Sequence, residues 1–176
     1  MTPPLRWQSD DPARTRQCGC LLGRLLRAGD VVALSGALGA GKTQFVKGLA
    51  AGLDVRADEV VSSPTFVLMR EYAGRLRLYH LDAYRLHDVD ELLALGWEEL
   101  LEEPGAVVVL EWADRVPDAV PPAAWRIELE HLSELGRLLT ISGPNPEMLG
   151  QLAAHLPGRS GRVDAAGNAE KPAADG

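Results

Sequence analysis

The stretch 35-SGALGAGKT-43 combines closely spaced glycines with a lysine and a threonine. Glycine loses more backbone entropy than any other residue when a chain becomes ordered, so this spacing favours a loop over a helix or a strand. Gly36, Gly41, Lys42 and Thr43 match the pattern of a phosphate-binding loop, with a short apolar run before it and a helical pattern after it. We call residues 36–43 the glycine loop.

A loop of this kind binds phosphate mainly through its backbone. Glycines allow successive N–H groups to point inward, and the following helix adds the positive end of its dipole at the same place. Lys42 can then reach the β- and γ-phosphate oxygens, and the Thr43 hydroxyl can bind Mg²⁺. The predicted nucleotide-binding residues of the loop are Gly36, Ala37, Leu38, Gly39, Ala40, Gly41, Lys42 and Thr43. The pattern predicts a site for a nucleoside triphosphate and Mg²⁺.

Such a site also needs a carboxylate that holds the metal from the other side, at the end of a neighbouring strand. Two residues have this position: Asp82 follows 76-LRLYHL-81, and Glu111 follows 106-AVVVL-110. We expect one of them to bind Mg²⁺ directly or through water, and the other to position the attacking water. The pattern does not distinguish the two roles.

Thr65 lies in the polar stretch 62-SSPTF-66, which we call the switch segment. Pro64 restricts the backbone of Ser63 and stiffens this turn. In nucleotide switches, a threonine on such a loop senses the γ-phosphate and its metal, which makes Thr65 a candidate catalytic residue. From these residues alone, an ordinary turn hydroxyl is the favoured interpretation of Thr65.

The elements that must position these residues alternate between strand and helix patterns, which predicts an α/β protein: a P-loop nucleotide-binding fold with a central mixed β-sheet flanked by helices. The expected helices are 15–26, 42–53, 88–95, 97–103 and 145–156, and the expected strands are 31–35, 66–72, 76–81, 106–110, 125–132 and 137–142. Ser9 or Asp10, followed by Pro12, is the expected start of the first helix. Residues 117–123 are expected to form a proline-rich loop.

The length of 176 residues predicts one domain, over residues 1–156. The segment 157–176 has Val163 as its only large aliphatic residue, so we expect a disordered tail. The net charge of −7 argues against a protein that binds nucleic acid without a partner protein. The apolar runs are too short to cross a bilayer, no secretory leader pattern opens the chain, and Cys18 and Cys20 cannot frame a disulfide scaffold. These features predict a cytoplasmic protein without membrane association.

The motifs GALGAGKT, SSPTFVLMREY, YHLDAYRL and LEWAD, in this order and spacing, resemble those of the bacterial TsaE (YjeE) family. The resemblance covers about residues 5–142. It implies a small ATPase required for the threonylcarbamoyl modification of adenosine 37 in tRNAs, with ATP or ADP and Mg²⁺ as cofactors. It also implies that TsaD-like and TsaB-like proteins are its partners and that tRNA is reached only through them.

The resemblance assigns roles to single residues. It implies that Thr43 binds Mg²⁺, that Thr65 is the switch threonine, and that Asp82 and Glu111 are the acidic residues of the metal site. It implies that Thr15, on the first helix, and Trp112, after Glu111, lie near the nucleotide. Tyr84 and Arg85 have either a functional role or a packing role. Gly136 and Arg137 match a family GR signature whose role the sequence does not give. The chain departs from the family at Ala37, where an acidic residue is usual; because backbone groups hold the phosphates, we expect binding to persist.

Two other functions fit a phosphate-binding loop: a small-molecule kinase, and a nucleotide-gated binding module without useful hydrolysis. A kinase of this class usually carries an arginine-bearing lid helix over the phosphates. The segment between Thr65 and Asp82 reads as a tight hairpin, with Ala73 and Gly74 at its turn, and leaves little chain for a lid. The sequence therefore favours a slow ATPase that acts with partners.

Overall fold

The computed structural model describes residues 2–56, 59, 61–157 and 160–162. Its elements are β1 (Leu5–Ser9), α1 (Pro12–Leu25), β2 (Val31–Ser35), α2 (Lys42–Gly52), β3 (Met69–Tyr72), β4 (Arg77–Asp82), α3 (Val89–Ala94), α4 (Trp97–Glu102), β5 (Ala106–Glu111), η1 (Ala113–Arg115), η2 (Pro117–Ala119), β6 (Trp125–His131), β7 (Arg137–Ser142), α5 (Pro146–His155) and β8 (Ser160–Arg162).

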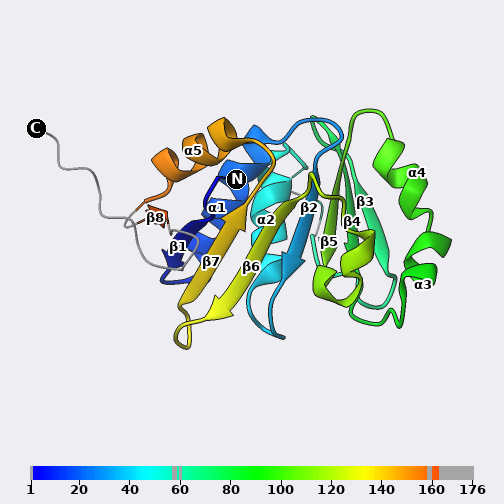
Figure 1. The fold of residues 1–176 in the computed structure, drawn as a ribbon, viewed down its shortest axis with the longest axis horizontal. Helices are drawn as coiled ribbons and strands as arrows, with labels where there is room; N and C mark the ends of the chain where they lie inside the picture. Colours follow the sequence, from blue (N-terminus) through cyan, green and yellow to red (C-terminus); the bar gives the residue numbers. More distant parts are fainter. Residues whose placement is uncertain (1, 57–58, 60, 158–159, 163–176) are drawn as a thin grey trace, which may run out of the picture.

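One mixed sheet runs through the molecule in the order β3-β4-β5-β2-β6-β7-β1-β8 (Figure 1). The four strands β4, β5, β2 and β6 are parallel to one another. Antiparallel strands flank them, with β3 on one side and β7, β1 and β8 on the other. The parallel centre matters for function because the carboxyl ends of β2, β4 and β5 meet at one edge of the sheet.

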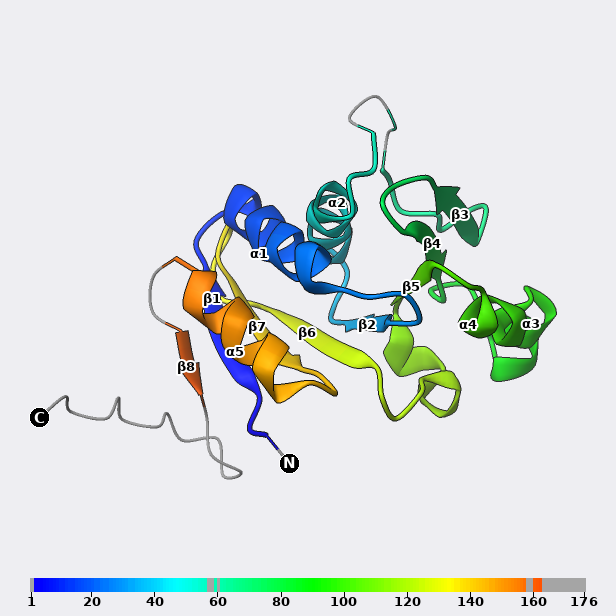
Figure 2. The ribbon, with the colours of Figure 1, turned by 90° about the horizontal axis from the view of Figure 1, so that it is seen from above.

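Helices cover the two faces of the sheet unequally (Figure 2). Helices α1 and α2 lie on one face, where α5 packs beside α1, and bury a core that includes Trp7, Phe45 and Trp125. Helices α3 and α4 and the turns after β5 lie on the other face, where Trp97 is buried against β4 and β5. Strands β2 and β5, in the middle, are apolar almost throughout because both of their faces are covered.

The helices α1 and α2 pack in direct backbone contact. A Cβ atom at Gly19 or Gly23 of α1 would overlap a backbone carbonyl oxygen of α2, and one at Gly48 or Gly52 of α2 would overlap a carbonyl oxygen of α1. Only glycine fits at these four positions. This contact fixes α2, which begins at Lys42, against the neighbouring helix.

The predicted helices and the six predicted strands are present, with boundaries that differ by a few residues. The first helix begins at Pro12 and is capped by Asp11, whose carboxylate accepts from the N–H groups of Ala13 and Arg14. The proline-rich stretch contains the short 3-10 turn η2. No helix among the described residues has the length and apolarity needed to cross a membrane.

Two strands were not predicted. Strand β1 pairs with β7, and β8 pairs with the outer side of β1. Because β8 comprises residues 160–162, the expectation of disorder from residue 157 onward is wrong for these residues, whose backbone joins the sheet. Residues 158–159 and 163–176 lie outside the described residues, so the rest of that expectation is untested.

Candidate functional site

The strand ends of β2, β4 and β5 bring the predicted residues together at one edge of the sheet. Asp82, the last residue of β4, lies beside Glu111, the last residue of β5, and Glu111 lies beside Leu34 of β2. One residue beyond Leu34, β2 ends at Ser35 and the glycine loop begins. Both carboxylates are buried. Two acidic groups from separate parts of the chain thus flank the loop.

The glycine loop adopts a conformation that requires its glycines. Gly36, Gly39 and Gly41 have φ angles of 133°, 75° and 103°, in the region that other residues rarely adopt. The loop leads directly into α2, whose N-terminus carries no side-chain cap. The first N–H groups of α2 therefore remain available for an anion, at the positive end of the helix dipole.

Lys42 is buried, with 4% of its surface exposed, and its charge faces the loop itself. Its Nζ donates to the carbonyl oxygens of Gly36 at 2.6 Å and Ala37 at 3.0 Å. The same Nζ lies 3.7 Å from the centre of the Trp112 ring. Burial lowers the pKa of Lys42, and the nearby carboxylates of Glu111, Asp114 and Asp82 oppose that shift.

Glu111 connects the glycine loop to a buried histidine. The Thr43 hydroxyl donates to its two carboxylate oxygens, at 3.2 and 3.3 Å. On the other side, His80 Nε2 lies 2.8 Å from Glu111 Oε1, and both side chains are buried. A carboxylate held from both sides has a fixed orientation, which is what a metal ligand needs.

Asp82 is held by the switch segment. The hydroxyls of Ser63 and Thr65 donate to its Oδ2 at 2.7 and 2.6 Å, and the backbone N–H of Tyr84 donates to its Oδ1 at 2.8 Å. The predicted switch threonine therefore touches the predicted metal-site acid directly. Asp82 is thus linked by hydrogen bonds to two residues of the switch segment.

These groups line a cavity of about 380 Å³, which we call the glycine-loop cavity. Its lining residues are Leu38, Gly39, Gly41, Lys42, Thr43, Gln44, Ser63, Thr65, Asp82, Tyr84, Glu111 and Trp112. Trp112 has a φ of 59° and packs against Tyr84 with ring centres 4.9 Å apart. Of the predicted loop residues, Gly36, Ala37 and Ala40 shape the loop without lining the cavity.

Thr15 lies beside the loop but does not open into the glycine-loop cavity. Its hydroxyl lies 2.8 Å from that of Ser9 and also bonds the Asp11 carbonyl, and the residue is buried. Its methyl carbon would lie 3.9 Å from a Cβ atom at Gly41. In this structure Thr15 lies next to Gly41 of the loop, outside the cavity.

The donor set suits Mg²⁺ more than a transition metal. Among the described residues, no group of three or more His, Cys, Asp and Glu side chains could hold a metal by itself. Thr43, Glu111 and Asp82 offer hydroxyl and carboxylate oxygens, which are the ligands of Mg²⁺ when phosphates and water complete its shell. The residues therefore fit a Mg²⁺ that binds together with a nucleotide.

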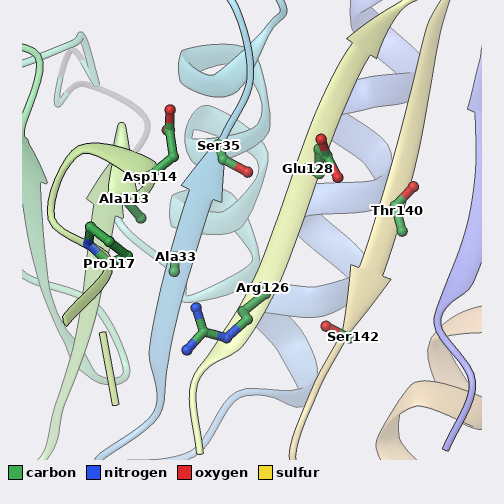
Figure 3. Close-up of a pocket in the computed structure, with 9 residues that line it drawn as sticks. All are labelled: Ala33, Ser35, Ala113, Asp114, Pro117, Arg126, Glu128, Thr140 and Ser142. Carbon is green, nitrogen blue, oxygen red and sulfur yellow. The ribbon is translucent and has the colours of Figure 1, made fainter. Parts of the chain in front are cut away.

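A second cavity, of about 320 Å³, lies on the face of the sheet that points away from α1 and α2 (Figure 3). Its lining residues are Ala33, Ser35, Ala113, Asp114, Pro117, Arg126, Glu128, Thr140 and Ser142. None of these nine was predicted for the site. Of its lining residues, Ser35 directly precedes Gly36 of the glycine loop.

Sequence reasoning missed the contacts of three residues that support the site, although it placed Ser63 in the switch segment and Arg137 in a family signature. His80 orients Glu111, Ser63 shares Asp82 with Thr65, and Arg137 bonds two carbonyl groups of the glycine loop. For His80, a signal existed: it precedes Asp82 by two residues on one strand, so both point to the same face. For Arg137, no local pattern indicates a contact with a loop so distant in the sequence.

Comparison with known proteins identifies relatives along most of the chain. Residues 9–139 match the family described as "Threonylcarbamoyl adenosine biosynthesis protein TsaE". The chain is 43% identical over 138 residues to the tRNA threonylcarbamoyladenosine biosynthesis protein TsaE of Treponema pallidum, covering 78% of this chain and all of that one. It is 37% identical over 148 residues to the protein of the same name from Bacillus subtilis, covering 82% of this chain and 90% of the relative.

A solved structure has the same fold. The crystal structure of Bacillus subtilis YdiB superposes with a TM-score of 0.73 at 33% sequence identity, covering 88% of this chain and 97% of that one. The family match, over residues 9–139, includes β2, the glycine loop and α2. The chain belongs to the TsaE family.

Proposed function

We propose that this protein binds ATP or ADP with Mg²⁺ in the glycine-loop cavity and hydrolyses ATP slowly, as part of the threonylcarbamoyl modification of adenosine 37 in tRNA. The observation that carries the proposal is the convergence of Lys42, Thr43, Asp82 and Glu111 on one cavity at the uncapped N-terminus of α2. The family match supports the role in tRNA modification.

Phosphate binding would use the loop N–H groups and Lys42. In the structure, Nζ of Lys42 donates to two carbonyl oxygens of its own loop. Phosphate oxygens carry more negative charge than a carbonyl, so a nucleotide would draw Nζ away from these bonds and from the Trp112 ring. Trp112 would then be free to pack against the nucleotide.

The Mg²⁺ ligands would come from Thr43, Glu111 and Asp82. Glu111 is the stronger candidate for the nearer ligand, because it already bonds the Thr43 hydroxyl and is oriented by His80. When bound, Mg²⁺ neutralises charge on the phosphates and orients them for attack by water. Asp82, which holds Thr65, would link the metal site to the switch segment and position the water.

The composition of the switch segment and the short β3–β4 connection support slow hydrolysis. The switch segment, 62-SSPTF-66, contains neither the glutamine nor the arginine that positions water or neutralises charge in faster hydrolases. The β3–β4 connection consists of residues 73–76 and forms no lid helix, which disfavours the small-molecule kinase. The catalytic residues we propose are Lys42, Thr65, Asp82 and Glu111.

Action through partner proteins is supported by apolar side chains exposed beside the cavity. Phe66 and Val67, which follow Thr65, are 84% and 56% exposed, and Leu38 in the loop is 76% exposed. Exposed apolar side chains gathered at one place are typical of interaction sites. We propose that TsaD-like and TsaB-like proteins bind here in a nucleotide-dependent manner and that tRNA is reached only through them.

The experiment that tests nucleotide binding is calorimetry with ADP and a non-hydrolysable ATP analogue, with and without Mg²⁺. Wild type should bind both nucleotides, and Lys42→Ala should bind them much more weakly. Lys47→Ala, which removes an equal charge from the same helix outside the cavity, is the matched control. If wild type does not bind either nucleotide, the proposed function is wrong.

A further inference from the structure

The guanidinium group of Arg137 joins the glycine loop to the turn between β6 and β7. Arg137 is the first residue of β7, and residues 132–136, which we call the hairpin loop, precede it. Its Nε donates to the carbonyl oxygen of Ala40 at 3.0 Å, and its Nη2 donates to that of Gly39 at 3.1 Å. One planar guanidinium group thus holds two neighbouring peptide groups of the glycine loop, through donors on the same side of the group.

The remaining donors of Arg137 hold the hairpin loop. Nη1 donates to the carbonyl oxygens of Ser133, Glu134 and Gly136 at 3.1, 3.2 and 2.8 Å. Within the described ranges, Arg137 forms no ion pair with a carboxylate, so its hydrogen bonds go to backbone carbonyls. Gly136 is suited to this turn because a Cβ atom there would lie only 2.6 Å from Oγ of Ser133.

The orientation of these carbonyl groups bears on phosphate binding. In a trans peptide the C=O and the N–H of one unit point in opposite directions. When Arg137 pulls the Ala40 carbonyl outward, the N–H of Gly41 is turned toward the inside of the loop. The N–H of Ala40 closes a turn onto the carbonyl of Ala37 at 3.1 Å, which shapes the loop from within.

Other contacts attach β6 to the same loop. A Cβ atom at Gly36 would overlap the carbonyl oxygen of Leu129, so the start of the loop lies directly against β6. His131 Nε2 lies 3.4 Å from the carbonyl oxygen of Leu38. The contacts of Leu129 and His131 with the loop differ from that of Arg137. Arg137 supplies a permanent positive charge and a planar pair of donors.

We infer that Arg137 is a positioning residue of the nucleotide site. It holds the carbonyl groups of Gly39 and Ala40 outward, so that the loop is already in the phosphate-binding conformation before a nucleotide arrives. Arg137 does not line the glycine-loop cavity and acts on the nucleotide through the loop. This inference rests on the proposed function and gives a physical role to the Gly136-Arg137 pair.

The test uses the full chain and three variants. Arg137→Met keeps an unbranched side chain but removes the donors, and Arg137→Lys keeps the charge but removes the planar fork. Arg126→Met is the matched control, because Arg126 also donates to two backbone carbonyls, those of Val120 and Pro121, but away from the glycine loop. The readouts are the Kd for Mg-ADP, the Tm of the nucleotide-free protein, and the amide proton shift of Gly41 on adding ADP.

We expect Arg137→Met and Arg137→Lys both to weaken Mg-ADP binding by about tenfold to a hundredfold, the size of effect that small misplacements in a preorganised site produce. Both should reduce the Gly41 shift, with Tm changes no larger than that of Arg126→Met. An unchanged Kd in Arg137→Met would overturn the inference. So would wild-type affinity in Arg137→Lys, because charge alone would then suffice. Failure of wild type to bind Mg-ADP would instead refute the proposed function.

Discussion

At the scale of single residues, the defining feature is a lysine whose ammonium group donates to carbonyl oxygens of its own loop. Lys42 has its charge buried, bonds the carbonyls of Gly36 and Ala37, and lies against the Trp112 ring. Desolvation of an ammonium group is costly, and these interactions offset part of that cost. Under the proposed function, phosphate oxygens would replace them.

The first prediction concerns this lysine. Lys42→Ala should lower the rate of ATP hydrolysis by about a hundredfold or more, because it removes the charge that meets developing phosphoryl charge. Phosphate release from the purified variant measures the effect, and Lys47→Ala should retain the wild-type rate. Near-normal turnover in Lys42→Ala would refute the assignment of the glycine loop as the catalytic phosphate site.

A second prediction separates the two buried acids. Glu111→Gln keeps the size of the side chain but removes its charge, so the Mg²⁺ concentration for half-maximal hydrolysis should rise by about tenfold or more. Asp114→Asn is the control, since Asp114 acts on Lys42 electrostatically, whereas the Thr43 hydroxyl bonds Glu111. Equal Mg²⁺ requirements in Glu111→Gln and wild type would exclude Glu111 as a metal ligand.

At the scale of elements, the switch segment and the ends of β4 and β5 form one unit. Thr65 and Ser63 both donate to Asp82, and Phe66 follows with most of its surface exposed. A metal at Asp82 would compete with these hydroxyls for the carboxylate oxygens. Under the proposed function, the nucleotide state would thereby change the surface that residues 62–67 present.

The third prediction tests this link through partner affinity. Wild type should bind a TsaD–TsaB type complex with different affinities in the presence of an ATP analogue, ADP or no nucleotide, because regulation requires such a difference. Thr65→Val, which keeps the shape but lacks the hydroxyl, should reduce the difference. Equal wild-type affinities in all three states would exclude nucleotide-gated assembly, and an unaltered Thr65→Val profile would remove Thr65 from it.

The fourth prediction concerns the core on the α1 and α2 side of the sheet. Cys18, on α1, is fully buried in this core, and burial raises the pKa of its thiol well above the usual range. A neutral buried thiol stabilises the fold below pH 9.0, the ordinary value, and this contribution declines as the pH rises above it. In Cys20→Ser, iodoacetamide should label Cys18 only as the protein unfolds. Rapid labelling of folded Cys20→Ser would contradict the burial of Cys18 in this core.

Much of the element scale could be predicted, because strongly apolar strands such as β2 and β5 and the glycine loop are local patterns. Strand β1 could not, because Leu5–Ser9 is short and its partner, β7, lies at residues 137–142. The same reason applies to β8. Pairing between distant segments leaves little trace in either segment alone.

At the scale of the whole molecule, the C-terminal segment adds the outermost strand at one edge of the sheet. The carbonyl oxygen of Pro157 accepts from Trp7 Nε1 at 3.1 Å and from Arg14 Nη2 at 2.7 Å, and β8 covers the outer side of β1. These hydrogen bonds and the pairing of β8 with β1 join the C-terminal segment to the N-terminal part of the chain. We therefore expect this segment to stabilise the sheet.

The fifth prediction distinguishes two truncations. Removal of residues 163–176, which are poor in apolar side chains, should leave the Tm unchanged. Removal of residues 157–176 also removes β8 and the Pro157 carbonyl, which leaves buried Trp7 without its acceptor and should lower the Tm by several degrees. Thermal unfolding of both truncated proteins measures this, and equal Tm values would show that β8 contributes nothing to stability.

The sequence predicted the main residues of the candidate site better than the hydrogen bonds between them. The glycine loop, Asp82 and Glu111 each come at the end of an apolar strand, and this pattern alone places them at one edge of the sheet. The bonds of His80 to Glu111 and of Arg137 to the glycine loop depend on how side chains from distant strands meet. Thr15 illustrates the difference: it was expected near the nucleotide, but in the structure it does not line the glycine-loop cavity and its hydroxyl is engaged with Ser9.

The glycine contacts between α1 and α2 have a consequence for the timing of motions in the molecule. Because the two helix backbones touch, neither can open while the other stays closed, and α2 carries Lys42 and Thr43 at its start. Segments without such contacts open locally, at a lower cost in free energy. The amide hydrogens in the interiors of α1 and α2 should therefore exchange with solvent deuterium only through unfolding of the whole domain, whereas those of residues 62–68 and of the uncapped first turn of α2 should exchange far sooner. Nucleotide should slow exchange at residues 62–68 and at that first turn, and in the helix interiors only as far as it stabilises the whole domain.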